Sequence, residues 1–256
     1  MTNRALLSLL STTVIMYSAN VCADTELHIQ QAALVQPFGD QAGSKADTLI
    51  FTLQHSSNWA YGSNFFFVDT IRTRYNTDFY AEWYPSLSSA KAFDWQFSGW
   101  IKDLRLVAGI NAGADSNVMK YLPGVQISWD MPGFTFFNTM LTGYLDDNQG
   151  LASGGAPREG DSWMLDIAWR YPISTSSQKF SIEGHAEFIQ GRSTELANVR
   201  KKDWVLAQIQ LRWDLGHALW NTPNQLFVGT EYQIWRNKLG TSLNEDVAQL
   251  LVVWRF

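Results

Sequence analysis

The chain has 256 residues, of which 46% are hydrophobic and 17% charged, and its formal net charge is −5. This charged fraction lies well below the roughly 25% of an average soluble protein, and the chain is rich in rings, with 12 Trp, 9 Tyr and 15 Phe. After the first residues no apolar run is long enough for a spanning helix, which excludes a helical membrane protein. The acidic balance argues against a nucleic-acid partner, because nucleic-acid binding needs a basic face.

The first 23 residues have the pattern of an export signal. A basic residue precedes an apolar stretch from Ala5 to Tyr17, and Val21 and Ala23 occupy the −3 and −1 positions of a small-residue cleavage site. We therefore expect a mature chain that begins at Asp24 and leaves the cytoplasm. Cleavage would also remove Cys22, the only cysteine, so the mature chain has no thiol or disulfide chemistry. A lipoprotein anchored at Cys22 is the alternative.

From the cleavage site to the end, apolar and polar residues alternate with the period of two that is typical of β-strands. In the closing segment, the apolar face consists of Ala248, Leu250, Val252, Trp254 and Phe256. The pattern predicts twelve strands, with ten or fourteen as alternatives. Their approximate ranges are 27–36, 48–55, 64–72, 78–85, 100–111, 121–130, 134–145, 162–171, 179–190, 202–214, 225–235 and 246–256.

Aromatic residues lie near the ends of the apolar stripes, as Trp163 and Tyr171 do. A soluble sandwich would turn such faces into a core rich in Val, Ile and Leu. Aromatic residues at both ends of strands of about ten residues are instead typical of the lipid-facing band of a transmembrane barrel. The sequence therefore predicts an all-β, antiparallel, up-and-down barrel over residues 24–256, located in the outer membrane of a Gram-negative cell.

The connections between the predicted strands alternate between long and short. Long polar connections face outward if the N-terminus lies in the periplasm, and they cover residues 146–161, 191–201 and 236–245. The short connections 131–133 and 172–178 then face the periplasm, which is the asymmetry of bacterial outer-membrane barrels. In hydrocarbon an open sheet edge is costly, so we expect the strands to close into a ring. A ring of about twelve strands has a bore suited to small polar solutes.

Two stretches resemble a known family. They are HSSNWAYGSNFFFVD at 55–69 and DFYAEWYPSLSS at 78–89, and the segment GVQISWD at 124–130 and the terminal Phe256 agree with them. These residues resemble the Tsx-like nucleoside-specific channel family, including its OmpK-type relatives. The resemblance implies a twelve-stranded outer-membrane barrel that passes nucleosides.

The period of two predicts which side chains line the lumen. Burying Asp69 and Glu82 in lipid would be costly, so both should face inward, together with Phe65, Phe67 and Tyr80 on the same strand faces. Nucleobases stack on such rings for roughly 1–3 kcal/mol each, and ribose hydroxyls donate to carboxylates. The alternative is that the two phenylalanines fill the lumen and that Asp69 pairs with Arg72 or Arg105.

The same reasoning places further polar residues on the lumen wall. The predicted solute-binding set includes Glu183, Glu187, Arg212 and Glu231. Most of the other inward residues are expected to form a solvated, ion-paired lining, and they are Asp166, Arg170, His185, Gln208, Gln210 and Gln233. Rings of one sign select ions by charge. A lining of mixed sign therefore favours a neutral polar solute.

The function predicted from the sequence is passive, substrate-selective diffusion of nucleosides or similar small polar solutes. A lipid hydrolase would need His and Ser side chains that meet, but His55 and Ser56 are adjacent in a strand and point to opposite faces, so we expect no enzyme. Four histidines and no cysteine in the mature chain argue against a metal site, and no cofactor is expected.

The alternative function is a plugged structural or surface-receptor barrel. Expected partners are the solute, outer-membrane lipid and the barrel-insertion machinery, with phage or colicin at the loops left open.

Overall fold

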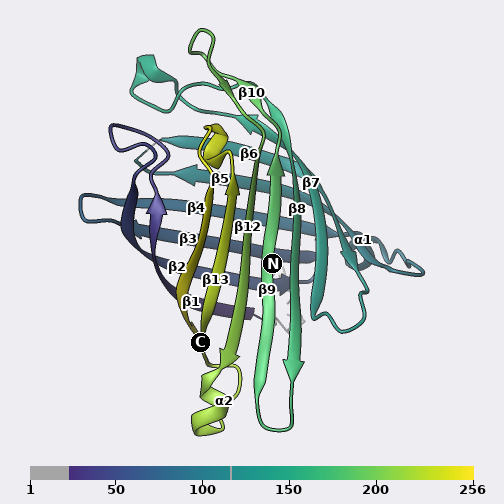
Figure 1. Ribbon diagram of the computed structural model, residues 1–256. Coiled ribbons are helices and arrows are strands. Elements are labelled where there is room, and N and C mark those ends of the chain that lie inside the picture. Colours follow the sequence, from purple (N-terminus) through teal and green to yellow (C-terminus); the bar gives the residue numbers. More distant parts are fainter. Residues whose placement is uncertain (1–22, 116) are drawn as a thin grey trace, which may run out of the picture.

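The computed structural model describes residues 23–115 and 117–256, so nearly all of the predicted export signal lies outside the described residues. Twelve strands form one closed antiparallel barrel in the order β1-β14-β13-β12-β9-β8-β7-β6-β5-β4-β3-β2 (Figure 1). The ring closes where β1 pairs with β14, with Leu27 opposite Trp254. The predicted fold class and the count of twelve strands are confirmed.

The barrel strands extend beyond the predicted ranges at half of their ends and fall short or coincide at the others. Their bounds are β1 (Ala23–Val35), β2 (Lys45–Trp59), β3 (Gly62–Arg72), β4 (Thr77–Ser88), β5 (Ile101–Gly113), β6 (Val118–Trp129), β7 (Phe136–Asp146), β8 (Ser162–Ser174), β9 (Lys179–Ile189), β12 (Trp204–Asp214), β13 (Leu226–Arg236) and β14 (Glu245–Arg255).

The two ends of the barrel differ, and we name them by what they carry. The loop end carries the long connections β7–β8 and β9–β12, which contain the short helix η1 (Leu151–Ser153) and the hairpin of β10 (Arg192–Ser193) with β11 (Arg200–Lys201). A third loop-end connection contains η2 (Lys238–Gly240). The opposite end, the terminal end, carries Ala23, where the described chain begins, and the C-terminus.

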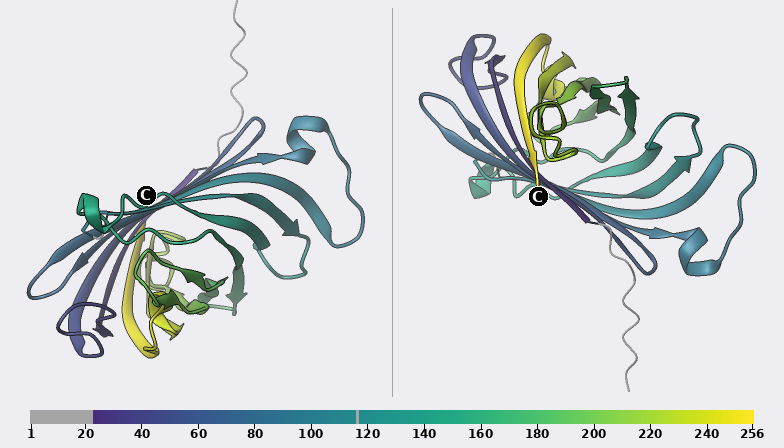
Figure 2. Two further views of the ribbon diagram at one scale, coloured as in Figure 1. Left: turned by 90° about the horizontal axis from the view of Figure 1, so that it is seen from above. Right: turned by 90° about the horizontal axis from the view of Figure 1, so that it is seen from below.

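Two connections at the terminal end contain helices that the alternation of the sequence did not reveal, α1 (Ser89–Phe93) and α2 (Leu215–Trp220). Each begins at a polar residue that accepts a backbone hydrogen bond, because the first amides of a helix have no partner within it. Ser88 accepts from Lys91 at 3.1 Å, and Asp214 accepts from His217 at 2.8 Å. Figure 2 shows α1 and η1 far apart on opposite sides of the barrel.

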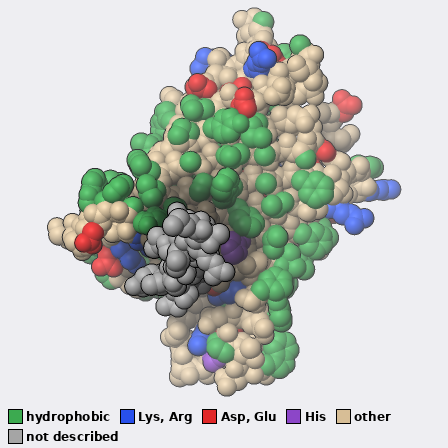
Figure 3. All heavy atoms as spheres, turned by 180° about the vertical axis from the view of Figure 1, so that it is seen from behind, with side chains coloured by type: hydrophobic (Ala, Val, Ile, Leu, Met, Phe, Trp, Pro, Cys, Tyr) green, Lys and Arg blue, Asp and Glu red, His purple; other side chains and the backbone are tan. Residues whose placement is uncertain are grey.

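The outer face of the barrel is apolar. Leu250 is 71% exposed, Leu106 60% and Leu211 54%, although all three lie within strands. Exposed rings lie toward both ends of the strands: Phe79, Tyr121 and Trp163 toward the loop end, and Trp59, Tyr171 and Trp254 toward the terminal end. Figure 3 shows hydrophobic side chains spread over the barrel face, with charged side chains gathered at its margins. The lipid-facing band predicted from the stripes is therefore present.

None of the helices in the described ranges is long and apolar enough to cross a membrane.

A charge placed in this band should destabilise the fold, whereas the same charge in the lumen should not. Leu250 lies at the middle of β14, so Leu250→Arg should cost about 2–4 kcal/mol of folding free energy. Asn138 is half-buried on the lumen side of β7, and Asn138→Arg is the matched control. Urea-dependent folding into lipid vesicles measures both. Equal destabilisation by the two substitutions would show that the assigned faces are wrong.

Candidate functional site in the barrel lumen

Contacts across the barrel identify the lumen-facing side chains. Arg170 on β8 approaches Glu26 on β1 at 3.9 Å, although these strands lie five places apart in the ring. The rings of Tyr144 on β7 and Trp204 on β12 lie 6.2 Å apart, across three places. Only inward-facing side chains can make such contacts. Alternate residues of each strand share these faces, so the period of two fixes the rest of the lining.

Five of the predicted site residues gather on the neighbouring strands β3 and β4, and we call them the aromatic–carboxylate cluster: Phe65, Phe67, Asp69, Tyr80 and Glu82. The ring of Phe67 lies 6.3 Å from that of Phe65 and 6.1 Å from that of Tyr80. The strand register places Phe67 opposite Glu82 and Asp69 opposite Tyr80. All five are half-buried, which leaves part of each side chain open to the lumen.

Hydrogen bonds hold the two carboxylates of this cluster in place. The Tyr80 hydroxyl donates to Glu82 Oε1 at 2.6 Å, and Asn111 Nδ2 on β5 donates to the same oxygen at 2.9 Å. The Thr52 hydroxyl on β2 donates to Asp69 Oδ1 at 2.6 Å. In each case one carboxylate oxygen has no hydrogen-bond partner within the described ranges. The free oxygens can accept from a solute.

The alternative pairing of Asp69 with an arginine is wrong. Arg105 pairs with Asp103 at 2.9 Å and donates to the Ser63 hydroxyl at 2.6 Å. Arg72 is exposed on the other face of β3. Asp69 therefore remains in the cluster with the phenylalanines.

A second group, the arginine cluster, lies toward the terminal end and contains Glu26, Arg170, Glu183, Arg212 and Arg255. Glu26 pairs with Arg212 at 3.0 Å and with Arg255 at 2.5 Å. Glu183 pairs with Arg170 at 3.2 Å and with Arg212 at 3.4 Å. Three guanidinium groups therefore share two carboxylates. These pairs join β1, β8, β9, β12 and β14 from inside the ring.

Glu231 is the centre of a network of amides. Its carboxylate accepts from Gln208 at 3.0 Å, from Gln210 at 2.7 Å and from Gln249 at 2.8 Å. Glu231 is 2% exposed and Gln249 1%. A solute could reach Glu231 only after some of these bonds break. In this structure the residue holds β12, β13 and β14 together.

His185 and Glu187 lie on the wall opposite the aromatic–carboxylate cluster. His185 bonds to Asp166 at 3.1 Å and to Gln208 at 2.8 Å, and its side chain is 34% exposed. Glu187 follows it on the same face of β9 and is half-buried. Glu82 on β4 is close enough to His185 on β9 for their charges to interact, although the two strands are separated by four others in the ring. The accessible part of the lumen is thus bounded by polar groups on both walls.

The lumen also contains apolar side chains that the sequence analysis did not predict. One cluster crosses from β5 to β13, and its buried members are Val107, Leu122, Met140, Tyr144, Met164, Ile189, Trp204 and Trp235. A smaller one comprises Phe227, Leu251 and Val253. These residues occupy inward positions, so the interior is narrower and less polar than a purely mixed-charge lining would be.

Ionic groups at the loop end sit above the larger apolar cluster. Glu159, from the β7–β8 connection, pairs with Arg192 at 2.5 Å and with Lys120 at 2.9 Å. Lys120 also pairs with Asp146. The guanidinium of Arg192 lies 4.7 Å from the ring centre of Tyr144 and 4.6 Å from that of Trp204, which are cation–π distances. A loop residue is therefore inserted between two lumen-facing rings.

The electrostatics of this loop-end group favour the charged form of Glu159. Burial alone would raise the pKa of Glu159, but the charges of Arg192 and Lys120 hold that pKa below its ordinary value. The carboxylate therefore stays ionised in the folded protein at neutral pH and ties the two long loops together.

Every residue of the predicted binding set faces the lumen. The structure joins Phe65, Phe67, Asp69, Tyr80 and Glu82 in one cluster, and it places Glu183 and Arg212 in another. Sequence reasoning missed Glu26, although an inward charge on the first strand was a usable signal. It also missed Glu159 and Arg192, because loop residues carry no periodicity.

His55 and Ser56 lie on opposite faces of β2. His55 stacks on Phe66 at 5.2 Å on the outer face, and its Nδ1 bonds to the Thr25 hydroxyl at 2.8 Å. Ser56 occupies the opposite face of β2. The two residues therefore do not approach each other, as the alternation predicted.

No protein-family model and no curated protein sequence matches the chain. Solved structures do share its fold. The NanC porin aligns with a TM-score of 0.53 at 15% identity, over 91% of this chain and 100% of that one. The KdgM porin aligns with a TM-score of 0.50 at 9% identity, over 91% and 99%. An outer membrane channel from Pseudomonas putida F1 aligns with a TM-score of 0.50 at 9% identity, over 91% and 95%.

This chain has the fold of outer-membrane channels. At these identities the likeness is one of fold. Together with the closed ring and the apolar outer band it makes the chain an outer-membrane β-barrel, because in a membrane only helices and closed barrels satisfy their backbone groups.

Breaking the arginine cluster should destabilise the barrel. Glu26→Gln leaves the buried guanidinium of Arg212 without its closest carboxylate, so the free energy of unfolding should fall by about 3–5 kcal/mol. The control is Asp246→Asn, which breaks the exposed pair with Arg236 and should have almost no effect. Urea unfolding from vesicles measures both. An unchanged unfolding midpoint for Glu26→Gln would contradict the role given to the cluster.

The loop end should loosen on acidification because the pKa of Glu159 is lowered by its cations. Its stabilising effect is complete above the ordinary pKa of Glu, about 4.3, and is lost as the pH falls through the lowered folded value. Hydrogen exchange of residues 190–203, corrected for intrinsic rates, should show this loss. Glu159→Gln should remove the pH dependence, whereas Glu195→Gln on the same loops should keep it. The same profile in wild type and Glu159→Gln would refute this account.

Proposed function

We propose that the barrel is a passive channel for nucleosides or similar small, neutral, polar solutes. The observation that supports it best is the aromatic–carboxylate cluster, in which three rings lie beside two carboxylates and remain partly open to the lumen. Rings offer π-faces for a base, and the unbonded oxygens of Asp69 and Glu82 can accept from hydroxyl groups. The sequence resemblance to the Tsx-like family agrees with this proposal.

The remaining predicted site residues contribute in two ways under this proposal. Glu187 is half-buried opposite the cluster and is open to contact with the solute. Glu183, Arg212 and Glu231 are buried in ion pairs or in hydrogen bonds with side-chain amides. Under this proposal they set the electric field and the width of the lumen. Their mixed signs favour a neutral solute over an ion, since single-sign rings select by charge. The fold is shared with solved porins and an outer membrane channel, and it supports the passage of a solute through the barrel. It does not indicate which solute passes.

Removing the two phenylalanine rings should abolish discrimination between solutes while keeping permeability. In Phe65→Ala/Phe67→Ala, we expect the half-saturating uridine concentration to rise at least about tenfold, because each lost stack is worth roughly 1–3 kcal/mol. Arabinose flux should stay the same or increase, because the path widens. Flux into liposomes measures both. Asp69→Asn should have a milder effect, since the amide oxygen still accepts a hydrogen bond.

Phe79→Ala is the matched control, because this ring lies on the same pair of strands but is 48% exposed on the lipid side. It should leave both fluxes unchanged. A wild-type uridine flux that rises linearly and equals that of a sugar of similar size would remove the nucleoside site. A folded barrel that passes neither solute would instead be the plugged receptor.

A further inference from the structure

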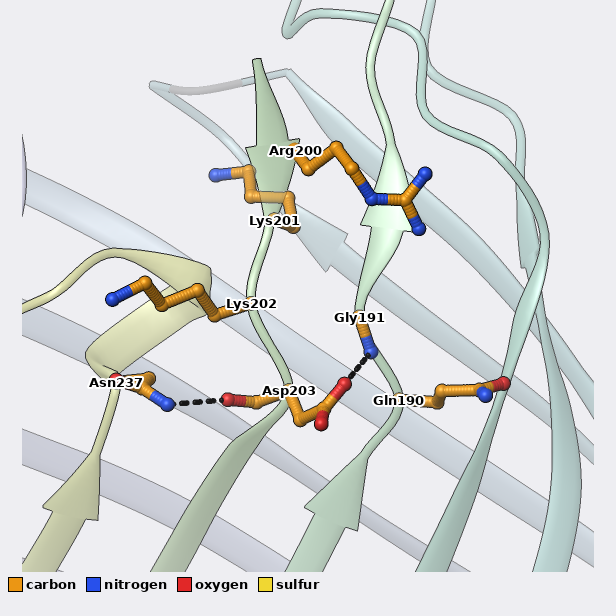
Figure 4. A pocket seen from close by; sticks show the side chains of 7 residues that line it. All are labelled: Gln190, Gly191, Arg200, Lys201, Lys202, Asp203 and Asn237. Atoms are coloured by element: carbon orange, nitrogen blue, oxygen red, sulfur yellow. Dashed lines mark hydrogen bonds between the residues drawn. The ribbon is translucent and has the colours of Figure 1, made fainter. Parts of the chain in front are cut away.

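A pocket of about 470 Å³ opens at the loop end, outside the lumen site. It lies where β9 leads into β10 and where β11 leads into β12, beside the start of the β13–β14 connection (Figure 4). The residues that line it are Gln190, Gly191, Arg200, Lys201, Lys202, Asp203 and Asn237. The lining therefore contains three consecutive basic residues and one carboxylate.

Asp203 is already engaged in shaping the pocket. Its Oδ1 accepts from the Gly191 amide at 2.7 Å, and its backbone oxygen accepts from Asn237 Nδ2 at 2.9 Å, as Figure 4 shows. These two bonds tie three connections together at the floor of the pocket. The carboxylate thus holds the shape of the site and leaves the lining with an excess of positive charge.

Two of the three cations have no partner. Arg200 and Lys202 are exposed, and among the described residues neither forms an ion pair or a side-chain hydrogen bond. Figure 4 shows the side chains of Lys201 and Lys202 extending to one side and that of Arg200 to the other. Lys201 lies 3.9 Å from Glu159. The Lys201 ammonium also donates to the Leu239 carbonyl at 3.2 Å and lies 4.7 Å from the ring centre of Phe38, so Lys201 is already engaged.

Lys201 has mixed electrostatic surroundings. Burial lowers the pKa of its ammonium group, the charge of Glu159 raises that pKa, and the charges of Arg192 and Lys120 lower it further. The unpaired charge of the pocket is therefore that of the exposed Arg200 and Lys202, and it gives the site the electrostatic character of an anion site.

We infer that this pocket binds a phosphate-bearing sugar headgroup. Ammonium and guanidinium groups form their strongest hydrogen bonds with phosphate and carboxylate oxygens. The volume exceeds that of a bare phosphate ion and leaves room for a sugar beside Gln190 and Asn237, whose amides suit hydroxyl groups. The headgroup comes either from a phosphorylated glycolipid of the outer leaflet or from a free sugar phosphate. The inference does not depend on the solute that the lumen passes.

Binding is tested on the purified full barrel in detergent with glucosamine 6-phosphate as the probe and glucosamine as its unphosphorylated counterpart. Calorimetry should show saturable binding of the phosphorylated sugar alone, weakened by added salt. Arg200→Ala/Lys202→Ala should weaken it at least about tenfold. The control Lys102→Ala/Lys179→Ala removes the same charge at the terminal end and should bind like wild type. Lys202→Ala alone is the second variant if the pair fails to fold.

Native mass spectrometry with lipid A and with its dephosphorylated form separates the two sources. Retention of lipid A by wild type and its loss in the double variant would identify the glycolipid, whereas binding of the soluble sugar alone would identify a free ligand. Equal binding of glucosamine and its phosphate, or equal affinity in wild type and the double variant, would overturn the inference. Uridine flux should be unchanged in the double variant, so failure here leaves the channel proposal intact.

Discussion

The pairing of the first strand with the last is the constraint on which this structure depends. An open edge would leave backbone groups without partners in hydrocarbon, at several kcal/mol for each group. β1 and β14 close the ring backbone to backbone, and Phe256 adds a bond from its amide to the Thr25 carbonyl. Inside the ring, Glu26 pairs with Arg255 across the same seam. Closure is therefore secured on the lumen side as well as in the sheet.

Closure also decides what the interior becomes. A ring of twelve strands is too narrow to leave its inward charges fully hydrated, so buried groups such as Arg212 and Glu231 must be satisfied by one another. The apolar cluster around Trp204 fills more of the bore. Half-buried side chains remain in the aromatic–carboxylate cluster and at His185 on the opposite wall. The channel we propose passes between these side chains, and its selectivity would come from the few side chains left unburied.

The fold was predictable from the sequence because apolar and polar residues alternate with a period of two and no spanning helix is present. In a membrane, such strands can satisfy their backbone groups only by closing into a barrel. The inward placement of Phe67 and Glu82 followed from the same period. Other features were beyond this reasoning for physical reasons. Arg192 reaches the lumen from a loop, and α1 and α2 are set by local caps at Ser88 and Asp214. The contact of Trp204 with Tyr144 was not foreseen, because alternation shows that a residue faces inward but does not show which strand it meets across the ring.

In the proposed channel, an open, water-filled path runs past the aromatic–carboxylate cluster. Current recordings on single wild-type barrels in planar bilayers test for this path. We expect stepwise ionic conductance that uridine reduces in a saturable way, because a stacked base occupies the path that ions use. Barrels that insert with normal heat-modifiability but carry no current, or whose current is indifferent to uridine at every concentration, would contradict it.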